Sequence, residues 1–509
     1  MARVSVVPEW LSDAGHDAPW SQLTVCVAGV GISGRAAARV LAALGAQVIA
    51  VDDRDGEPER AAAAELARLG VTVRLGDGAT FPDGVQLIVT SPGWRRESPL
   101  FAAAADRGVP VWGEPELAWR LRRPGDAEWL VITGTDGKTT TTLMLESILR
   151  AAGLRTIAAG NIDVPLVEVV NSGYDVLAVE LGSFQLHWSP SVAPKAAAVL
   201  NVAPDHLDWW GGSFTDYANA KGRAFAHPRT CAIGNLDDPQ TVRLLARAPG
   251  RRVGFTLHSP RPDQVGVHDG VLLDRAFVPD PARDVVELAT VTDIPVPGAH
   301  NVANALAAAA LARSIGVEPA AIAAGLRTFT PAAHRIATVA EVDGVRFVDD
   351  SKATSPHAAA ASLTSFDRIV WIAGGLGKDV AFDELVSQVA DRLRGVVLLG
   401  ACRHEIADAL RRHAPQVPVI DVGGAETGDV HAVLDAAVAA AVRYAAPGDV
   451  VLLAPAAASY DMFRDYRHRG QAFADAVRRY AERRSAAERR EAAAQVGPSG
   501  PAESAGGSR

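Results

Sequence analysis

The part of the chain whose chemistry is easiest to interpret is a glycine turn followed by lysine and threonine. Residues 130–141 read LVITGTDGKTTT, an apolar stretch that leads into Gly134, Thr135, Asp136, Gly137, Lys138, Thr139 and Thr140. Apolar residues at helical spacing follow, so we expect a strand, a turn and a helix. Backbone N–H groups of such a turn and the lysine charge suit a polyphosphate, and the threonine hydroxyl suits Mg²⁺. The segment predicts an ATP-binding loop, although Ile132 stands where the usual loop has a glycine.

Polar residues near the ends of two later apolar stretches are candidates for the same site. Glu180 lies near the end of VLAVEL (176–181), His206 follows AAAVLNV (196–202), and Lys221 lies in a predicted helix after them. A carboxylate is an oxygen ligand of the kind that Mg²⁺ prefers, and the histidine offers a second metal ligand. Alone, a histidine or lysine in such a place is more often structural. Because the carboxyl ends of parallel strands meet at one edge of a sheet, we predict that these residues gather around the loop.

A second glycine pattern predicts a nucleotide diphosphate site near the N-terminus. Residues 29–34 read GVGISG, and Asp52, Asp53 and Arg54 follow the next predicted strand about twenty residues later. Ser91, Pro92 and Gly93 follow a further strand and belong to the same sheet edge. The alternative is a merely structural turn. An NAD-dependent oxidoreductase would explain this pattern but leaves the phosphate loop and Glu180 without a role.

Two later segments also place polar groups at the ends of elements. In PGAHNVANALAAA (297–309), Asn301 either caps a helix or contacts an adenine ring edge, and the spacing alone favours the cap. The segment VDDSKATS (348–355) ends another predicted strand. Its polar groups would need hydrogen-bond partners if buried, which argues against a packing role. Glycine- or alanine-rich loops, GGLGK (374–378) and APAAAS (454–459), end the later strands of the same block.

Strands and helices alternate along most of the 509 residues, which predicts an α/β protein with parallel sheets. We expect three domains. A Rossmann-like domain of residues 21–123 follows an N-terminal extension of residues 1–20. A central P-loop-type domain covers residues 124–331, with a small β-rich part, and a C-terminal Rossmann-like domain covers residues 332–484. Residues 485–509 have almost no apolar content and are predicted to form a disordered tail.

Composition narrows the class of protein. The net charge is −9, with mixed signs and no basic stripe, so nucleic acid is not an expected partner. The first twenty residues lack the features of a signal peptide, and no apolar run approaches the ~20 residues that span a bilayer. Cys26, Cys231 and Cys402 lie far apart in apolar contexts. They are typical of reduced cysteines in a cytoplasmic protein.

Taken in order, these motifs resemble the Mur ligase family. The segments that carry the resemblance are GTDGKTTT, GNI (160–162), ELGSFQL (180–186), DHLDWW (205–210), GAHNVANALAA (298–308), AHR (333–335), DDSKATS, GGLGK and PAAASYDMF (455–463). They extend over about residues 24–483. GVGISG, VDDR (51–54) and SPG (91–93), with DDSKATS, further resemble the members that act on D-glutamate. Four positions depart from the family pattern: Asp136, Asp163, Gly182 and Leu376.

The resemblance implies a bacterial, cytoplasmic ligase that makes a peptidoglycan precursor. ATP would phosphorylate the carboxylate of UDP-N-acetylmuramoyl-L-alanine, and the amine of D-glutamate would attack the acyl phosphate through a tetrahedral intermediate, with release of ADP and phosphate. A monomer is expected. A different Mur-type or folylpolyglutamate ligase would share most of these motifs, and a catalytically inactive scaffold would share the folds. The retained Lys138, Glu180, His206 and Lys221 weigh against the scaffold.

The resemblance also implies individual roles. ATP would be held by the loop residues 134–140 with Asn301, Arg335 and Asp350. Two Mg²⁺ ions would be held by Thr139, Glu180, His206 and Lys221, the last carrying a carboxyl group on its amine (a carbamate). The UDP substrate would contact Gly31, Ser33, Gly34, Asp52, Asp53, Arg54, Ser91, Pro92, Gly93, Asn161 and His206. D-glutamate would contact Lys352, Thr354, Ser459 and Tyr466.

Overall fold

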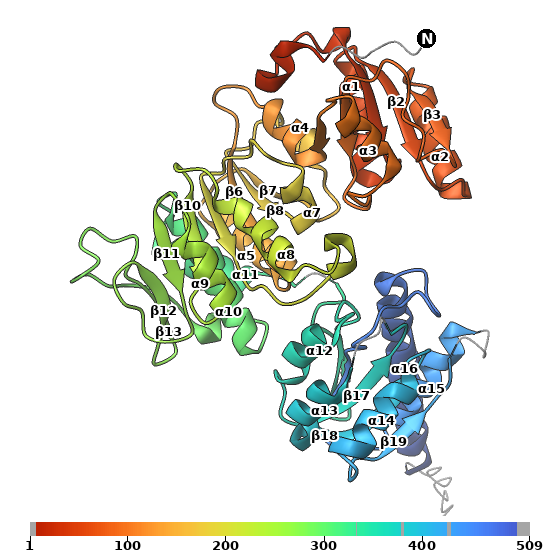
Figure 1. Ribbon diagram of the computed structural model, residues 1–509. Helices are drawn as coiled ribbons and strands as arrows, with labels where there is room; N and C mark the ends of the chain where they lie inside the picture. The colour runs from red at the N-terminus through yellow and green to blue at the C-terminus, as the bar shows by residue number, and fades with distance from the viewer. Residues whose placement is uncertain (1–6, 332, 378–380, 425–428, 496–509) are drawn as a thin grey trace, which may run out of the picture. The chain divides into compact units, whose positions relative to one another are not determined.

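The computed structural model describes residues 7–331, 333–377, 381–424 and 429–495, and the chain forms two compact units. Unit 1 comprises the chain up to residue 295 together with residues 299–330, and unit 2 comprises residues 296–298 with the chain from residue 331 onward. Unit 1 contains two sheets and unit 2 contains one (Figure 1). Three α/β domains were expected, and the three sheets confirm that fold class.

The first sheet of unit 1 is entirely parallel. Its strands are β1 (Thr24–Ala28), β2 (Gln47–Asp52), β3 (Thr72–Leu75), β4 (Leu87–Thr90) and β5 (Val111–Gly113), in the order β3-β2-β1-β4-β5. Its helices are α1 (Ile32–Ala43), α2 (Glu57–Ala67), α3 (Pro99–Asp106) and α4 (Glu114–Arg120). The strand order reverses direction at β1, where the chain steps next to β4. The GVGISG turn therefore lies at the point where open parallel sheets bind ligands.

The segment before β1 is packed into this domain. It forms two short 3₁₀ helices, η1 (Glu9–Asp13) and η2 (Trp20–Gln22). Leu11 and Trp20 are buried at 1% and 2% exposure, and the indole of Trp20 lies edge-on to Trp112 with ring centroids 6.5 Å apart. Residues 7–20, which the sequence placed outside the first domain, thus contribute to its core.

Replacement of Trp20 by alanine is expected to destabilise unit 1 by about 3–5 kcal/mol, because a large side chain leaves a cavity in a close-packed core. Chemical denaturation followed by circular dichroism measures the effect. Gln22→Ala is the matched control, since Gln22 is exposed in the same 3₁₀ helix. Equal free energies of unfolding for the two variants would mean that the segment is not part of the core.

The second sheet of unit 1 has nine strands in the order β14-β13-β12-β11-β10-β9-β6-β8-β7. They are β6 (Glu128–Thr133), β7 (Thr156–Gly160), β8 (Val176–Glu180), β9 (Ala196–Val199), β10 (Cys231–Asn235), β11 (Arg252–Phe255), β12 (Gln264–His268), β13 (Val271–Asp274) and β14 (Val286–Thr290). The strands from β7 to β12 are parallel, and β12, β13 and β14 form an antiparallel meander. This meander is the predicted β-rich part, joined to the main sheet rather than separate from it.

Seven α-helices accompany this sheet: α5 (Lys138–Ala151), α6 (Leu166–Val169), α7 (Ser183–His187), α8 (Phe214–Gly222), α9 (Pro239–Ala246), α10 (Ala299–Arg313) and α11 (Pro319–Thr328). Short 3₁₀ helices are η3 (Leu207–Trp210), η4 (Arg223–Phe225) and η5 (Val291–Asp293). The central strand β6 pairs with β8 on one side and β9 on the other. The loops that follow these three strands therefore meet at one sheet edge.

Two buried carboxylates at the start of α4 join the two sheets of unit 1. Glu114 Oε1 accepts the N–H of Val167 at 2.8 Å, and Glu116 Oε2 accepts the N–H of Ser191 at 3.0 Å. Glu116 also pairs with Arg120 one turn later, at 2.7 Å. Because buried acceptors are costly without donors, these bonds fix the position of α4 against the central domain.

The sheet of unit 2 has the order β15-β16-β20-β17-β18-β19, parallel except for β15. Its strands are β15 (Ala337–Val342), β16 (Val345–Asp349), β17 (Ile369–Gly374), β18 (Leu393–Leu399), β19 (Val419–Asp421) and β20 (Val450–Leu453). The five predicted strands are confirmed. The sixth, β15, forms a hairpin with β16 through Asp343 and Gly344, both at positive φ, a two-residue turn that the sequence signals but we did not predict.

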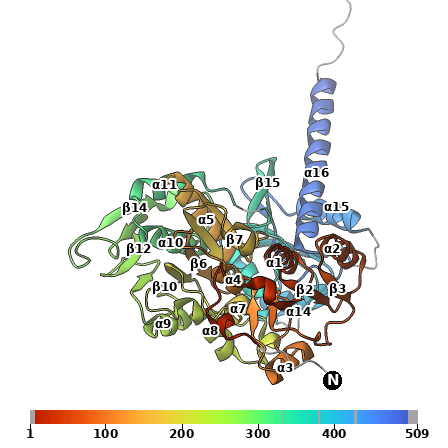
Figure 2. The same cartoon turned by 90° about the horizontal axis from the view of Figure 1, so that it is seen from above.

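The helices of unit 2 are α12 (Pro356–Leu363), α13 (Asp383–Val389), the 3₁₀ helix η6 (Ala390–Arg392), α14 (Arg403–His413), α15 (Val430–Ala441) and α16 (Tyr466–Gln495). Figure 2 shows the length of α16. Its extent corrects the prediction for residues 485–509, because residues 485–495 are helical. Alanine, arginine and glutamate are strong helix formers, so a segment poor in apolar residues can extend a helix that begins in a folded domain. Residues 496–509 lie outside the described residues.

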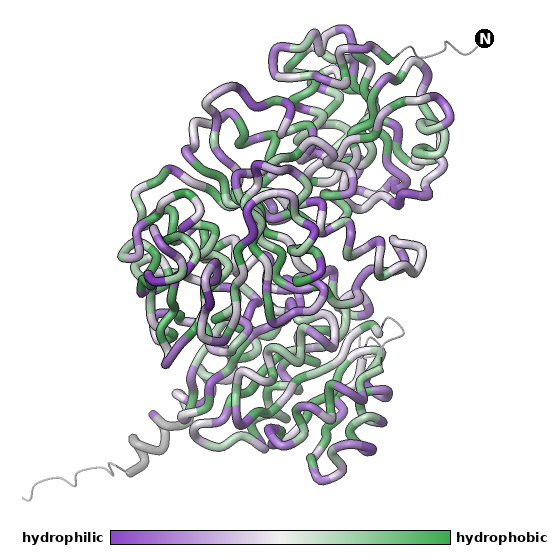
Figure 3. Tube along the Cα trace, turned by 60° about the vertical axis from the view of Figure 1, so that its left-hand side comes forward, coloured by the Kyte–Doolittle hydropathy of each residue, from purple (hydrophilic) through white to green (hydrophobic). Residues whose placement is uncertain are grey.

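Most buried residues of the strands and helices are apolar. Figure 3 shows how hydrophobic and hydrophilic residues are distributed along the chain. In unit 2 the buried apolar residues form two clusters that include alternate residues of β17, Trp371 and Ile372 among them. Cys26 and Cys402 are buried, Cys231 is half-buried, and all three are free thiols, as predicted. In the described part of the chain, no helix has the length and apolar character needed to cross a bilayer.

Candidate active site

The predicted phosphate loop lies between β6 and α5, as the sequence indicates. Gly134 and Gly137 adopt positive φ angles of 158° and 80°. A Cβ on Gly137 would lie 2.4 Å from Asn304 Oδ1, so only glycine fits there. The ammonium of Lys138 donates hydrogen bonds to the carbonyls of Gly134 (2.8 Å) and Thr135 (2.6 Å). The lysine is thus folded over its own loop, at the N-terminus of the helix that it begins.

Asn201, which follows β9, fixes the backbone of this loop. Its Oδ1 accepts the N–H of Asp136 at 2.9 Å, its Nδ2 donates to the carbonyl of Asp136 at 3.1 Å, and its own carbonyl accepts the N–H of Thr135 at 3.0 Å. Sequence reasoning did not assign Asn201 to the site. Its place at the end of a strand that neighbours β6 was the available signal.

The structure brings Thr139 and Glu180, two of the predicted metal ligands, into contact. The hydroxyl of Thr139 donates to Glu180 Oε2 at 2.7 Å, and Asn161 Nδ2 donates to Glu180 Oε1 at 3.1 Å. Both Thr139 and Glu180 are buried, and Glu180 of β8 lies directly opposite Ile132 of the neighbouring strand β6. Adjacent hydroxyl and carboxylate oxygens at a phosphate loop fit the preference of Mg²⁺ for oxygen ligands, so these residues suit one metal ion.

Lys221 reaches the same loop from α8. Its side chain is buried at 2% exposure, and its ammonium donates to the carbonyl of Gly134 at 2.7 Å. Lys138 donates to that same oxygen. Burial, and then the nearby charge of Lys138, hold the pKa of Lys221 well below its usual value. The ammonium also lies 4.6 Å from the ring centroid of Tyr217, whose hydroxyl is 3.0 Å from Thr135 Oγ1.

His206 is placed differently from the other predicted metal ligands. Its side chain is 51% exposed, and its described contacts are with Asp205 (Nε2–Oδ2, 3.5 Å) and with the ring of Phe184. Its backbone is left-handed, with φ 48°. Across the described residues, no three side chains of histidine, cysteine, aspartate or glutamate are grouped so as to hold a metal. The predicted set depends instead on Thr139 and on a modified Lys221.

The N-terminal turn is held by Asp52. Asp52 Oδ2 accepts the N–H of Val30 at 2.9 Å, and Oδ1 accepts the N–H of Arg54 at 3.0 Å. Burial alone would raise the pKa of Asp52, but these N–H groups and the Arg54 side chain lower it. Because the carboxylate is already bonded on both oxygens, it positions the turn, while Asp53 and Arg54 are exposed beside it.

The other predicted substrate residues lie at the same edge of the sheet. Gly31 precedes α1, and Ser33 and Gly34 lie in its first turn. A Cβ on Gly34 would lie 1.9 Å from the carbonyl oxygen of Gly29, so glycine is required there. The hydroxyl of Ser91 is buried without a hydrogen-bond partner among the described residues, while Pro92 is half-buried and Gly93 is exposed.

The loop that contains SPG touches the DHLDWW segment of the central domain. Trp209 Nε1 donates to the carbonyl of Trp94 at 2.8 Å, and Arg95 pairs with Asp208 at 2.7 Å. Trp209 belongs to an aromatic cluster with Phe184 and Trp210, with ring centroids 4.6 Å apart in both pairs. Within unit 1, therefore, the predicted UDP-substrate loop and the segment that carries His206 are in direct contact.

Asn301 lies inside α10, two residues after its start, so the cap interpretation was wrong. The side chain is buried and its Oδ1 accepts Asn304 Nδ2 at 3.3 Å. It points inward because α10 is apolar almost all round and buried along its length. Asn304, one turn later, packs against Gly137 of the phosphate loop.

Unit 2 carries the remaining predicted residues. Asp350 is buried, and burial raises its pKa to about 6 although Ser362 and Arg335 act in the opposite direction. The Lys352 ammonium lies 4.2 Å from the ring centroid of Tyr466. Ser459 is buried in the loop after β20, and Thr354 is half-buried in the loop after β16. The structure thus brings Lys352 and Tyr466 into contact and places the other two on neighbouring strand ends.

The local structure explains how the chain accommodates two of the departures from the family pattern. Asp163 adopts φ 57°, the left-handed region that favours glycine, and aspartate is among the other residues that tolerate it. Gly182 is the N-cap of α7, where its N–H donates to Gln185 Oε1 at 2.9 Å. Glycine instead of serine at such a cap costs only a few tenths of a kcal/mol.

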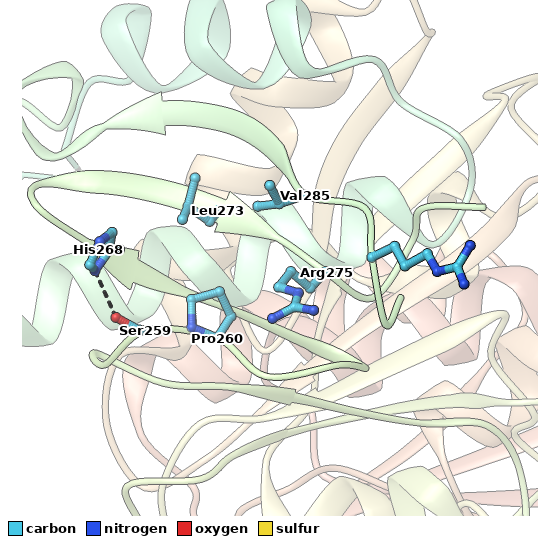
Figure 4. A pocket seen from close by; sticks show the side chains of 7 residues that line it. Ser259, Pro260, His268, Leu273, Arg275 and Val285 are labelled. Carbon is cyan, nitrogen blue, oxygen red and sulfur yellow. Dashed lines mark hydrogen bonds between the residues drawn. The ribbon is translucent and has the colours of Figure 1, made fainter. Parts of the chain in front are cut away.

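A pocket of about 330 Å³ lies elsewhere, on the meander of the central domain (Figure 4). It is lined by Ser259, Pro260, His268, Leu273, Arg275, Arg283 and Val285. Ser259 Oγ and His268 Nδ1 are 2.8 Å apart. Three strands separate β12 from β6, roughly 19 Å at the usual strand spacing, so this pocket is separate from the phosphate loop.

Three family models match consecutive parts of the chain. They are the Mur ligase MurD-like N-terminal domain (residues 23–113), the Mur ligase middle domain (132–312) and the Mur ligase glutamate ligase domain (334–457). Among solved structures, the chain is similar to a UDP-N-acetylmuramate-alanine ligase from Thermotoga maritima, with a TM-score of 0.53 and 20% identity over 90% of this chain and 99% of that chain. At this identity the likeness concerns the fold.

Curated relatives are similar along almost their whole length. The UDP-N-acetylmuramoylalanine–D-glutamate ligase of Streptomyces avermitilis is 58% identical over 465 residues, which cover 90% of this chain and 98% of the relative. The enzyme of the same name from Thermobifida fusca is 54% identical over 462 residues, 89% of this chain and 98% of the relative. The order of the three domains, the geometry of the phosphate loop and these identities lead to one conclusion: the chain belongs to the Mur ligase family.

Proposed function

We propose that this protein is the ATP-dependent ligase that joins D-glutamate to UDP-N-acetylmuramoyl-L-alanine in the synthesis of peptidoglycan precursors. The observation that carries the proposal is the phosphate loop with Thr139 bonded to Glu180, in a chain that matches D-glutamate ligases at 54–58% identity over nearly their full length. A reaction that consumes ATP and a UDP-linked precursor belongs in the bacterial cytoplasm. We expect the enzyme to work as a monomer.

The chemistry explains why a phosphate loop is needed. A carboxylate does not react with an amine in water, because its carbon is a poor electrophile and amide formation is uphill. Transfer of the γ-phosphoryl group to a carboxylate oxygen of the UDP substrate gives an acyl phosphate and ADP. The amine of D-glutamate attacks the acyl carbon, and the tetrahedral intermediate collapses with loss of phosphate. The protein contributes position and charge neutralisation.

Residues of unit 1 have the following proposed roles in that sequence. Backbone N–H groups of the loop and the Lys138 ammonium hold the β- and γ-phosphates. Thr139 and Glu180 offer oxygen ligands to one Mg²⁺, and His206 with Lys221 would help to hold a second. Bound Mg²⁺ would neutralise charge on the phosphates and the acyl group. Gly31, Ser33, Gly34, Asp53, Arg54, Ser91, Pro92, Gly93 and Asn161 are the proposed contacts of the UDP substrate.

Lys221 is proposed to act as a carbamate. As an ammonium it would repel a metal ion, whereas a carbamate offers oxygen ligands. The neutral amine reacts with CO₂ to give the N-carboxylate and one released proton. Burial beside Lys138 favours that neutral amine.

In unit 2, Lys352, Thr354, Ser459 and Tyr466 are proposed to hold D-glutamate, because a cationic lysine and hydroxyl donors suit a ligand with two carboxylates. Arg335 and Asp350 are the proposed contacts to the phosphate and ribose of ATP, with Asn301 at the adenine.

The decisive test is phosphate release from ATP that requires both UDP-N-acetylmuramoyl-L-alanine and D-glutamate, with mass spectrometry of the product. Alternative amine acceptors (L-glutamate, L-alanine and a diamino acid) separate this reaction from those of other Mur-type ligases. Turnover with another acceptor in preference to D-glutamate would overturn the proposal, and a change in nicotinamide absorbance would point to an oxidoreductase.

Asp52→Ala is expected to raise the Michaelis constant for the UDP substrate about tenfold while leaving that for ATP nearly unchanged. The variant loses the acceptor that holds the Val30 N–H, and each hydrogen bond to a charged group contributes about 1.5–3 kcal/mol. Steady-state kinetics with each substrate varied in turn measures this. Asp55→Ala is the control, because Asp55 is an exposed aspartate in the same loop after β2 and pairs with the exposed Arg60. A larger effect on ATP would mean that the first domain binds something else.

Asn201→Ala is expected to raise the Michaelis constant for ATP more than that for the UDP substrate. It removes both side-chain bonds to the backbone of Asp136, so the phosphate loop loses its fixed geometry and the Michaelis constant for ATP rises by about tenfold or more. Asn171→Ala, at a surface position that bonds Leu121, provides the control. An unchanged response to ATP would show that the loop keeps its shape without this residue.

A further inference from the structure

Arg469 is a buried cation in the first turns of α16, and its environment is unusual. It is fully buried, and the described hydrogen-bond partners of its guanidinium are five oxygen atoms, none of which belongs to a carboxylate. Nε donates to Ser351 Oγ at 3.0 Å, and the two terminal nitrogens donate to the carbonyls of Ser351 (2.9 Å), Gly374 (3.4 Å), Ala457 (3.1 Å) and Ala458 (3.3 Å).

Burying such a charge is unfavourable in itself. Burial lowers the pKa of Arg469 to about 10, so the side chain stays protonated at neutral pH. Removing a cation from water costs several kcal/mol, and an apolar residue of similar volume is often at least as stabilising. The arginine at this position is therefore better explained by the number of acceptors that a planar guanidinium can bond at once than by a gain in stability.

The five acceptors lie on the loops after three adjacent strands. Strand β20 lies between β16 and β17, so the loops at residues 350–354, 454–459 and 374–377 leave the sheet side by side. The guanidinium of Arg469 bonds to all three loops. The approach is close: a Cβ on Gly375 would lie 2.9 Å from an Arg469 nitrogen and 2.1 Å from the Ala458 carbonyl, which explains the glycine at that position.

The same loops carry the residues proposed to hold D-glutamate. Lys352 follows Ser351 directly, and Ser459 follows Ala458 directly. Ser351 Oγ, which accepts from Arg469, donates in turn to the carbonyl of Tyr466 at 2.8 Å. The ring of Tyr466 lies against the ammonium of Lys352. Arg469 therefore bonds to the residues that directly precede Lys352 and Ser459, and it is linked to Tyr466 through the Ser351 hydroxyl.

We propose that Arg469 is a positioning residue that sets the spacing of Lys352, Ser459 and Tyr466, and thereby the affinity for the acidic amino acid. This inference rests on the proposed function, because it takes these residues as the D-glutamate site. A residue that only stabilised unit 2 would change the melting temperature and the amount of folded enzyme. A positioning residue changes the Michaelis constant for one substrate out of three.

The test uses the full chain with three substitutions. Arg469→Lys keeps the charge but has three donors on one nitrogen, which cannot span three loops. Ser351→Ala removes one hydroxyl that links Arg469 to Tyr466, and alanine fits the space. Arg478→Lys is the control, since Arg478 lies on the same helix with a 58% exposed side chain. Each variant is assayed for the Michaelis constants of D-glutamate, ATP and the UDP substrate and for its melting temperature.

Arg469→Lys is expected to raise the Michaelis constant for D-glutamate at least about tenfold, the equivalent of one lost charge-assisted hydrogen bond, with the other two constants near the wild-type values. Ser351→Ala is expected to show a smaller rise of the same kind. If Arg469→Lys does not fold, Ser351→Ala alone decides. An unchanged D-glutamate constant in the folded variants, or an equal change for all three substrates, would overturn the inference. Failure of the proposed function is distinguishable, because the wild-type enzyme would then show no D-glutamate-dependent turnover.

Discussion

Lys138→Ala is expected to reduce ligation at saturating ATP by at least about 10²–10³-fold, the usual loss when one preorganised charge is removed from a transition state. In the phosphate loop this ammonium stands at the N-terminus of α5 and donates to the carbonyls of Gly134 and Thr135. In the proposed reaction, this ammonium would balance the negative charge that develops on a bound triphosphate. Phosphate release under saturating concentrations of all three substrates measures the effect.

Lys195→Ala is the control for that experiment, because Lys195 is exposed in the same domain. The melting temperature of Lys138→Ala should stay close to that of the wild type, since the bonds lost are two bonds to its own loop in a half-buried position. Retention of more than about a tenth of the activity would show that Lys138 is not the residue that neutralises the phosphates.

The second large effect is expected at Lys221. Lys221→Ala should be nearly inactive, because a carbamate that offers oxygen ligands at the phosphate loop would be lost. Acetate or formate at high concentration should restore part of the activity, since a small carboxylate can occupy the space that alanine leaves. The same acids should not restore Lys138→Ala, which lacks a cation. Lys221→Arg should stay inactive, because a guanidinium keeps the charge but does not form a carbamate.

Two observations would decide against the carbamate. One is full activity in Lys221→Arg, which would mean that the residue acts as a cation. The other comes from ¹³C nuclear magnetic resonance of enzyme equilibrated with ¹³C-bicarbonate. A carbamate signal is expected in the wild type and absent in Lys221→Ala, and its absence from both proteins would refute the modification independently of activity.

The fold and the outline of the site could be predicted from the sequence because the motifs lie where apolar stretches end. A parallel strand leaves its carboxyl end at one edge of the sheet, so the loop at Gly134, the carboxylate at Glu180 and the polar segment after residue 199 had to gather there. The contact between Thr139 and Glu180 follows from this rule, since Glu180 pairs with Ile132 across neighbouring strands.

What the sequence could not provide was the identity of the residues that hold these loops in place. Asn201 and Arg469 act through backbone groups of distant segments, and no spacing pattern reports such a contact. The burial of Trp20 depends on a partner, Trp112, that is ninety-two positions away. Asn301 was misread because a helix start and a buried helical turn share the same residue types. The helical residues 485–495 were missed because apolar content, which indicates packing, does not measure helix propensity.

The carbonyl oxygen of Gly134 has a consequence for turnover. It accepts hydrogen bonds from both Lys138 and Lys221, so it acts as an internal stand-in for an anion. A phosphate that engages the Lys138 ammonium must first compete with this oxygen, which makes the net affinity of the loop smaller than the sum of the new contacts. The same oxygen is available again when the ligand departs. Lys138 thus exchanges one partner for another, an arrangement suited to an enzyme that must release its nucleotide in every cycle.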